Sequence, residues 1–68
     1  MSIMERIYQL AAERNLSHAE LAKRSGISKS TFSNLEDRNG VPRMETIFRV
    51  CEGCGITFAE FFIGVDTL

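Results

Sequence analysis

The side chains best suited to recognise another molecule by hydrogen bonding lie close together near the middle of the chain: Lys29, Ser30, Ser33 and Asn34. On a helical wheel with Phe32 and Leu35 turned inward, Ser30, Ser33 and Asn34 point outward, and Lys29 lies on the flank of the same face. Lysine suits the two acceptors of guanine, asparagine can make a paired contact with adenine, and serine is permissive. A helix that enters a DNA major groove by its N-terminal end would bring these side chains to base edges. They are therefore candidate base-reading residues.

The segment around these residues predicts the helix that they need. Residues 17–37 read as two short helices joined by a turn at residues 25–27. Ser17 and Glu20 have the spacing of a capping box at the start of the first helix. Ser28 can cap the second helix with its hydroxyl group. The candidate base readers would then lie in the first turns of that second helix.

Apolar residues at helical spacing would pack the two helices against each other: Leu21, Ala22, Ile27, Phe32 and Leu35. Ala22 lies where the second helix would cross, and a larger side chain there would hold the helices apart. Gly26 falls where the first helix must end in a left-handed residue, which glycine adopts without strain. This arrangement is typical of a helix-turn-helix, the usual device for entering the major groove.

The remaining chain predicts three more helices. The first begins with a capping box at Ser2 and runs to about Arg14, with Asn15 as its stop. The next covers about residues 44–54, and the last begins with another capping box at Thr57 and runs to near Gly64. Residues 38–42 read as a loop. The expected fold class is all-α: a compact five-helix bundle that forms one domain over residues 1–68.

The charge pattern offers modest support for a nucleic-acid partner. The net charge is only −1, but residues 14–43 hold six basic against three acidic side chains, whereas residues 44–68 hold one against four. A positive side suits contact with phosphates, although a window of this size can reach such a balance by chance. The chain lacks an apolar run long enough to cross a membrane and the apolar block of a signal peptide, so we expect a cytoplasmic protein.

Residues for catalysis or metal binding are sparse. Cys51 and Cys54 would need about two more zinc ligands, and only His18 remains as a soft ligand, far along the chain. Both cysteines fall on apolar positions of a helix, which favours packing in the core over a metal or redox role. The carboxylates are scattered, and the sequence holds no glycine-rich phosphate loop. We therefore expect no catalytic residues, no metal and no cofactor.

The chain resembles the Cro/C1-type (XRE-like) helix-turn-helix family of phage repressors and small bacterial transcriptional regulators. The residues that carry the resemblance are Leu16-Ser17, Glu20-Leu21-Ala22, Ser25-Gly26-Ile27-Ser28, Leu35-Glu36, Pro42 and Gly55-Ile56-Thr57. The resemblance itself runs over roughly residues 7–62, nearly the whole chain. The resemblance implies a lambda-repressor-like DNA-binding domain and points to the same base-reading positions.

The resemblance also implies a set of phosphate contacts beside the second helix of the motif: His18, Thr31, Arg38, Asn39 and Arg43. In the family, the residue matching His18 often touches a phosphate, and the loop after the motif runs along the DNA backbone. Arg43 stands where the family has a serine or threonine cap, which costs a cap and gains a charge. For His18 and Arg43 plain solvent exposure stays open as the alternative.

A second departure from the family lies in the first helix. Family members often place an arginine at the position of Ala11, where it pairs with the acid that matches Glu36. Here Glu36 must find another partner, such as Arg14, or stay solvated.

Two copies of the chain would read an operator better than one. A single recognition helix reads few base pairs, and two-fold pairing places two such helices about 34 Å apart. We expect Phe61 and Phe62 to be buried, which leaves a candidate homodimer patch of Phe58, Ile63, Val65 and Leu68. The alternative is that the C-terminal tail folds back over its own bundle.

The sequence therefore predicts a sequence-specific DNA-binding transcriptional regulator, a repressor that binds double-stranded DNA as a homodimer. Two other classes stay open. The chain could be the antitoxin of a toxin–antitoxin pair, with a toxin protein as partner. It could also be a protein-interaction module that has lost DNA binding, which the low net charge would favour.

Overall fold

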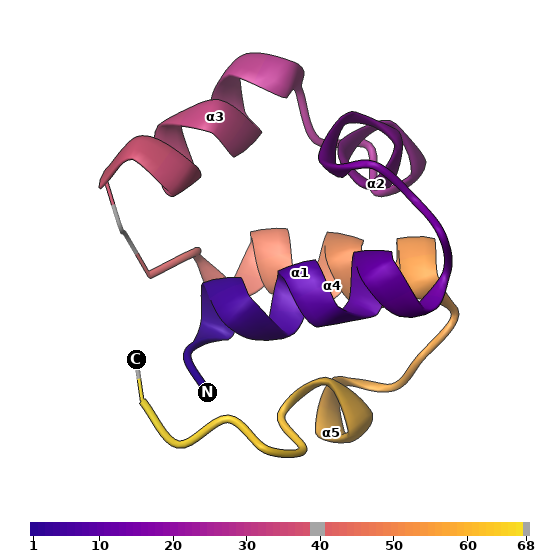
Figure 1. The fold of residues 1–68 in the computed structure, drawn as a ribbon, viewed down its shortest axis with the longest axis vertical. Helices are drawn as coiled ribbons and strands as arrows, with labels where there is room; N and C mark the ends of the chain where they lie inside the picture. The colour runs from indigo at the N-terminus through magenta and orange to yellow at the C-terminus, as the bar shows by residue number, and fades with distance from the viewer. Residues whose placement is uncertain (39–40, 68) are drawn as a thin grey trace.

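The computed structural model describes residues 1–38 and 41–67, and the backbone in these ranges is helical apart from loops and one isolated bridge. The helices are α1 (Ile3–Glu13), α2 (His18–Arg24), α3 (Lys29–Arg38), α4 (Met44–Cys54) and α5 (Phe58–Phe61). Figure 1 shows α2 and α3 on one side of the molecule, α5 on the opposite side, and α1 and α4 between them. The predicted all-α bundle is confirmed.

The core lies between these two sides. Its largest fully buried side chains come from four helices and are Ile7, Leu10, Leu21, Ile47, Val50 and Phe61. Within α1 and α4 these residues lie three positions apart, which is the spacing of one helical face. The core therefore joins α2, the first helix of the predicted motif, to α1, α4 and α5.

Three helices begin with the capping boxes that the sequence predicts. At α2, the backbone N–H of Glu20 donates to Ser17 Oγ at 3.1 Å, and the N–H of Ser17 donates to the Glu20 carboxylate at 2.9 Å. Equivalent reciprocal pairs begin α1 and α5. Accepting the backbone hydrogen bond lowers the pKa of Glu20 below its ordinary value of 4.5. These local signals determine where the helices begin.

Left-handed residues follow several helices as expected. Asn15 after α1 has φ 55°, and both Gly26 and Gly55 have φ 69°. The predicted end of the last helix is wrong, because α5 ends at Phe61 rather than near Gly64. Beyond Phe61 the chain makes tighter turns, in which the Ile63 N–H donates to the carbonyl of Glu60.

The C-terminal tail folds back onto the start of the chain. The Met1 ammonium group donates to Asp66 Oδ1 at 2.7 Å, and the Asp66 N–H donates to the Met1 carbonyl at 3.0 Å. Val65 is partly buried against the core, whereas Ile63 is 67% exposed. The ammonium group lowers the pKa of Asp66 through a hydrogen bond and its charge. The two termini are thus joined on the side of α5, away from α3 (Figure 1).

Candidate nucleic-acid interface

Helices α2 and α3 form the predicted helix-turn-helix. Four of the apolar residues predicted to hold them together are buried: Leu21, Ala22, Ile27 and Phe32. Leu35 is partly buried against the same core. Ser28 caps α3 as predicted, since its Oγ accepts a hydrogen bond from the Thr31 N–H at 3.1 Å. The motif is therefore a rigid pair of helices, with α3 attached to the molecule along one face only.

The outward face of α3 carries the candidate base readers. Lys29, Ser30, Ser33 and Asn34 are all exposed, while Phe32 on the same helix is 3% exposed. Asp37 is exposed as well, in the last turn of α3. The structure thus places the four candidates together, on a face that no other described helix covers.

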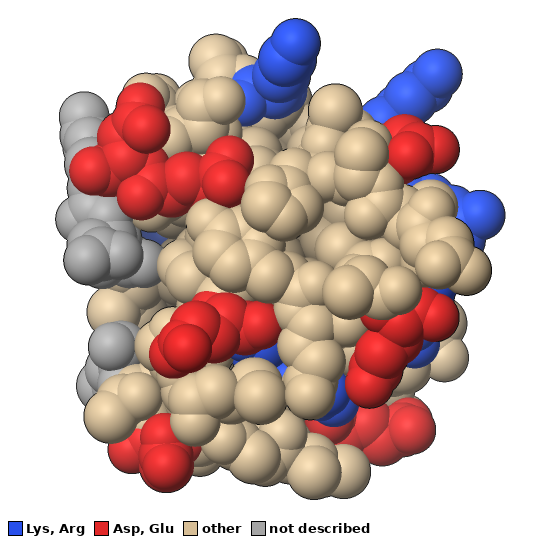
Figure 2. All heavy atoms as spheres, viewed as in Figure 1, with Lys and Arg blue, Asp and Glu red and all other residues tan. Residues whose placement is uncertain are grey.

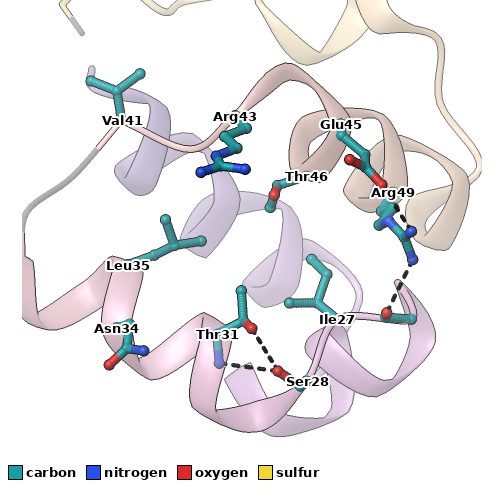
Figure 3. A pocket seen from close by; sticks show the side chains of 11 residues that line it. Ile27, Ser28, Thr31, Asn34, Leu35, Val41, Arg43, Glu45, Thr46 and Arg49 are labelled. Atoms are coloured by element: carbon teal, nitrogen blue, oxygen red, sulfur yellow. Dashed lines mark hydrogen bonds and ion pairs between the residues drawn. The ribbon is translucent and has the colours of Figure 1, made fainter.

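A groove of about 580 Å³ runs beside this face, between α3 and the start of α4 (Figure 3). Thr31 and Asn34 line it from α3, and Arg43 and Thr46 line it from the α4 side. Arg43 precedes α4 without a side-chain cap hydrogen bond, as the sequence predicts. A candidate base reader and two hydrogen-bond donors for phosphate therefore share one open surface.

Arg49 is a positioning residue that sequence reasoning missed. Its Nη1 donates to the Gly26 carbonyl at 3.3 Å, in the turn between α2 and α3, and its Nη2 pairs with Glu45 at 3.0 Å (Figure 3). The side chain is about half exposed, so the ion pair itself contributes little to stability. Its role is geometric, since it ties α4 to the turn of the motif. The spacing of Glu45 and Arg49 by four residues was the available signal.

His18 lies at the start of α2, where it contacts the two neighbouring helices. Its Nδ1 is 3.3 Å from Glu36 Oε2 on α3. Its ring stacks on Tyr8 of α1, with ring centroids 4.4 Å apart. Tyr8 donates its hydroxyl proton to the same Glu36 oxygen at 2.9 Å. Burial and the Glu36 carboxylate raise the pKa of Tyr8, which keeps the hydroxyl as a donor.

Glu36 finds another partner, one of the two options left open by the sequence, but that partner is not Arg14. Arg14 instead donates to the main-chain carbonyls of Leu10 and Cys54 and lies 3.7 Å from Glu13. Tyr8, which sequence reasoning missed, takes the place of the family's arginine as the α1 partner of Glu36. It lies three residues before Ala11, on the same side of α1.

The last two phosphate candidates fall in a part of the chain that is only partly described. The backbone of Arg38 ends α3, but its side chain lies outside the description, as does Asn39. Leu68 of the candidate dimer patch is also outside the described residues. Phe58, another member of that patch, is partly buried against the core.

Charge is less sharply divided on the surface than along the sequence. Figure 2 shows basic side chains that project from the edge formed by α2 and α3, while acidic groups spread over much of the remaining face. Some acidic groups also lie on the α3 side in this view. Contact with phosphates would therefore depend on the placement of single basic and polar side chains rather than on the net charge.

Neither cysteine has the surroundings of a reactive or metal-binding thiol. Cys51 is buried and Cys54 is partly buried, and both are free. Burial raises the pKa of both thiols, which disfavours the thiolate that binds metals. Among the described residues no group of three or more histidine, cysteine or acidic side chains is placed to hold a metal ion.

None of the described helices has the length and apolar character to cross a membrane.

Comparison with known proteins agrees with this geometry. A family model described as "Helix-turn-helix domain" matches residues 5–61, which covers most of the chain. The search of curated proteins found no match to this chain.

Proposed function

The chain belongs to the helix-turn-helix domain family, and we propose that it is a sequence-specific DNA-binding repressor that acts as a homodimer on a two-fold operator. One observation carries the proposal. The helix that this motif inserts into DNA, α3, buries Phe32 while all four candidate base readers are exposed. The Cro/C1-type subfamily, which the sequence resembles, is part of the same proposal.

In the proposed complex α3 enters the major groove by its N-terminal end. Lys29 at that end meets guanine acceptors, and Asn34, one turn further along, pairs with adenine. Ser30 and Ser33 lie between them and can hydrogen-bond to more than one base, so they discriminate little. This division predicts that base discrimination rests mainly on Lys29 and Asn34.

Phosphate contacts then hold α3 in register. Thr31 and Arg43 face the groove between α3 and α4, where one strand of the DNA backbone would pass. A guanidinium group has no acceptor with which to cap α4, but its N–H donors suit a phosphate. Arg38 and Asn39 belong to the same proposed set on the basis of the family resemblance.

Repression and dimerisation follow from how such a domain works. A single α3 reads only a few base pairs, and two copies on a palindrome multiply both affinity and specificity. A regulator that stays bound at a promoter excludes other proteins simply by occupying the site. No further activity is needed for this mode of regulation.

The proposal is tested by selecting bound sequences from a random duplex library and then measuring the affinity of variants for the selected site. Asn34→Ala should weaken binding by about 1–3 kcal/mol and relax the preference at one base position. Asp37→Asn is the matched control, because Asp37 is exposed on α3 but lies in its last turn. It should keep the wild-type sequence preference.

Two results would contradict the proposal. The first is an Asn34→Ala protein that keeps both affinity and preference, which would remove α3 as the reading helix. The second is a wild-type protein without salt-dependent affinity for any duplex, which would favour an interaction module instead. Binding of both duplex and a small toxin protein would identify an antitoxin.

A further inference from the structure

Three helices meet at one polar cluster that the base-reading scheme does not use. Tyr8 from α1, His18 from α2 and Glu36 from α3 contact one another, and His18 is the only histidine in the chain. The side chain of His18 is 49% exposed, whereas that of Glu36 is 30% exposed. The cluster thus presents one titratable ring to solvent, and a carboxylate lies behind it.

The position of Glu36 favours a hydrogen on one ring nitrogen. Its Oε2 accepts the hydrogen bond of Tyr8 and lies 3.3 Å from His18 Nδ1. A carboxylate oxygen cannot donate, so this approach is attractive only when Nδ1 carries a hydrogen. In a neutral ring Nε2 is then an acceptor, which a phosphate oxygen repels. Only the protonated ring can donate to Glu36 and to a phosphate at the same time.

The location of His18 suits a phosphate next to the base-reading face. A groove of about 130 Å³ lies between α2 and α3, lined by His18 and Ala19 from α2 and by Lys29, Ser33 and Glu36 from α3. Two of these residues are candidate base readers. Within the described chain no hydrogen-bond partner is found for His18 Nε2.

Groups from α1 and α3 face the ring. The Glu36 carboxylate lies beside it and the Tyr8 ring stacks on it. Lys29 lines the same groove, and Phe32, whose ring centroid is 6.0 Å from that of His18, carries no charge. A phosphate near Nε2 would add a second anion beside the ring, and an anion attracts an imidazolium ion.

We propose that DNA binding is coupled to protonation of His18, with Glu36 and Tyr8 as positioning residues that hold the imidazolium ring against a backbone phosphate. The proposal rests on the proposed DNA-binding function and adds that binding takes up a proton. The direction of the pH dependence follows from this. The protonated form binds better, so affinity falls as the pH rises through the range in which histidine loses its proton.

The primary experiment measures the affinity of the full chain for its selected duplex between pH 5.5 and 8.0 at constant salt. One coupled proton changes the affinity by at most about tenfold per pH unit. We expect a fall of about threefold to tenfold between pH 6 and pH 8. Calorimetry in two buffers with different ionisation enthalpies should show uptake of up to about half a proton per domain at pH 7, which is the slope of that fall.

Variants separate this coupling from general charge effects. His18→Gln keeps a donor for the phosphate but cannot titrate, so it should bind with little dependence on pH. Glu36→Gln should keep the hydrogen bond of Tyr8 but lower proton uptake. Glu13→Gln removes the same charge at the end of α1 and should leave the pH slope unchanged. Tyr8→Phe should give an intermediate slope.

The slope, rather than the affinity, is the readout, because a general change of charge moves the affinity at all pH values alike. Each variant is first compared with wild type by circular dichroism, so that a loss of structure is not read as a loss of coupling. If wild type binds duplex with a flat pH profile, or if His18→Gln keeps the wild-type slope, the proposed coupling is wrong while the DNA-binding function stands. If wild type binds no duplex at any pH in this range, the proposed function itself is wrong.

Discussion

At the scale of single residues, α4 approaches the end of α2 closely at Gly53. A Cβ atom at this position would lie 2.6 Å from Ser25 Oγ and 3.1 Å from the Ser25 Cα and N atoms. Ser25 ends α2, and its buried hydroxyl group has no hydrogen-bond partner among the described residues. A side chain at residue 53 would therefore push the motif away from the helix that supports it.

We predict that Gly53→Ala lowers the free energy of unfolding by about 1–3 kcal/mol, because overpacking outweighs the better helix propensity of alanine. Urea denaturation measures the change. Ser25→Ala alone should be neutral or stabilising by about 1 kcal/mol, since it removes an unpaired buried hydroxyl group. The double variant should regain part of the loss. A Gly53→Ala protein more stable than wild type would show that α4 can shift freely.

Single-residue predictions succeeded where they depended on helical periodicity and failed where they depended on tertiary contacts. The burial of Phe32 follows from the pattern of α3 alone, and so does the exposure of Lys29 and Asn34. The contact between Tyr8 and Glu36 spans 28 residues and depends on how α1 crosses α3. The close approach at Gly53 could not be predicted either, because the sequence shows only a glycine inside a helical pattern.

At the scale of helices, local capping signals predicted most boundaries. The predicted range 44–54 matches α4, which Gly55 ends in the left-handed conformation. The end of α5 was missed, because the turns after Phe61 bring the tail to Met1, a contact between the two ends of the chain. Arg43 is the exception to these capping signals. It occupies the N-cap position of α4, where a side chain that accepts a hydrogen bond would stabilise the helix.

The presence of arginine at position 43 therefore predicts that stability is lower and DNA affinity higher than with a capping residue. Arg43→Ser should raise the free energy of unfolding by about 0.5–2 kcal/mol by capping α4. It should also weaken binding to all duplexes and lower the slope of log affinity against log salt by roughly one unit. Arg43→Ala is the matched control, because it loses the charge without gaining a cap. If both variants keep the wild-type salt slope, Arg43 does not contact DNA.

At the scale of the whole molecule, the fold leaves some large apolar side chains in solvent. Met44 and Phe48 on α4 are 59% and 51% exposed, and Phe48 packs against Phe58 at a tilt, with ring centroids 4.4 Å apart. Ile63 in the tail is exposed further, at 67%. Exposed apolar surface of this kind suits pairing of two copies. The tail also folds back over its own bundle, which leaves Ile63 as the most accessible member of the proposed dimer patch among the described residues.

The proposed dimer therefore makes its sharpest prediction at Ile63. Ile63→Asp should keep the helical content, because the side chain is largely exposed in the monomer, but it should abolish dimerisation in sedimentation. Operator binding should weaken with it, since each half-site is then bound alone. Phe48→Asp is the comparison variant on α4. If Phe48→Asp gives monomers while Ile63→Asp stays dimeric, the pairing surface is the outer face of α4 rather than the tail. A wild-type protein that binds palindromic DNA only as a monomer would exclude the dimer altogether.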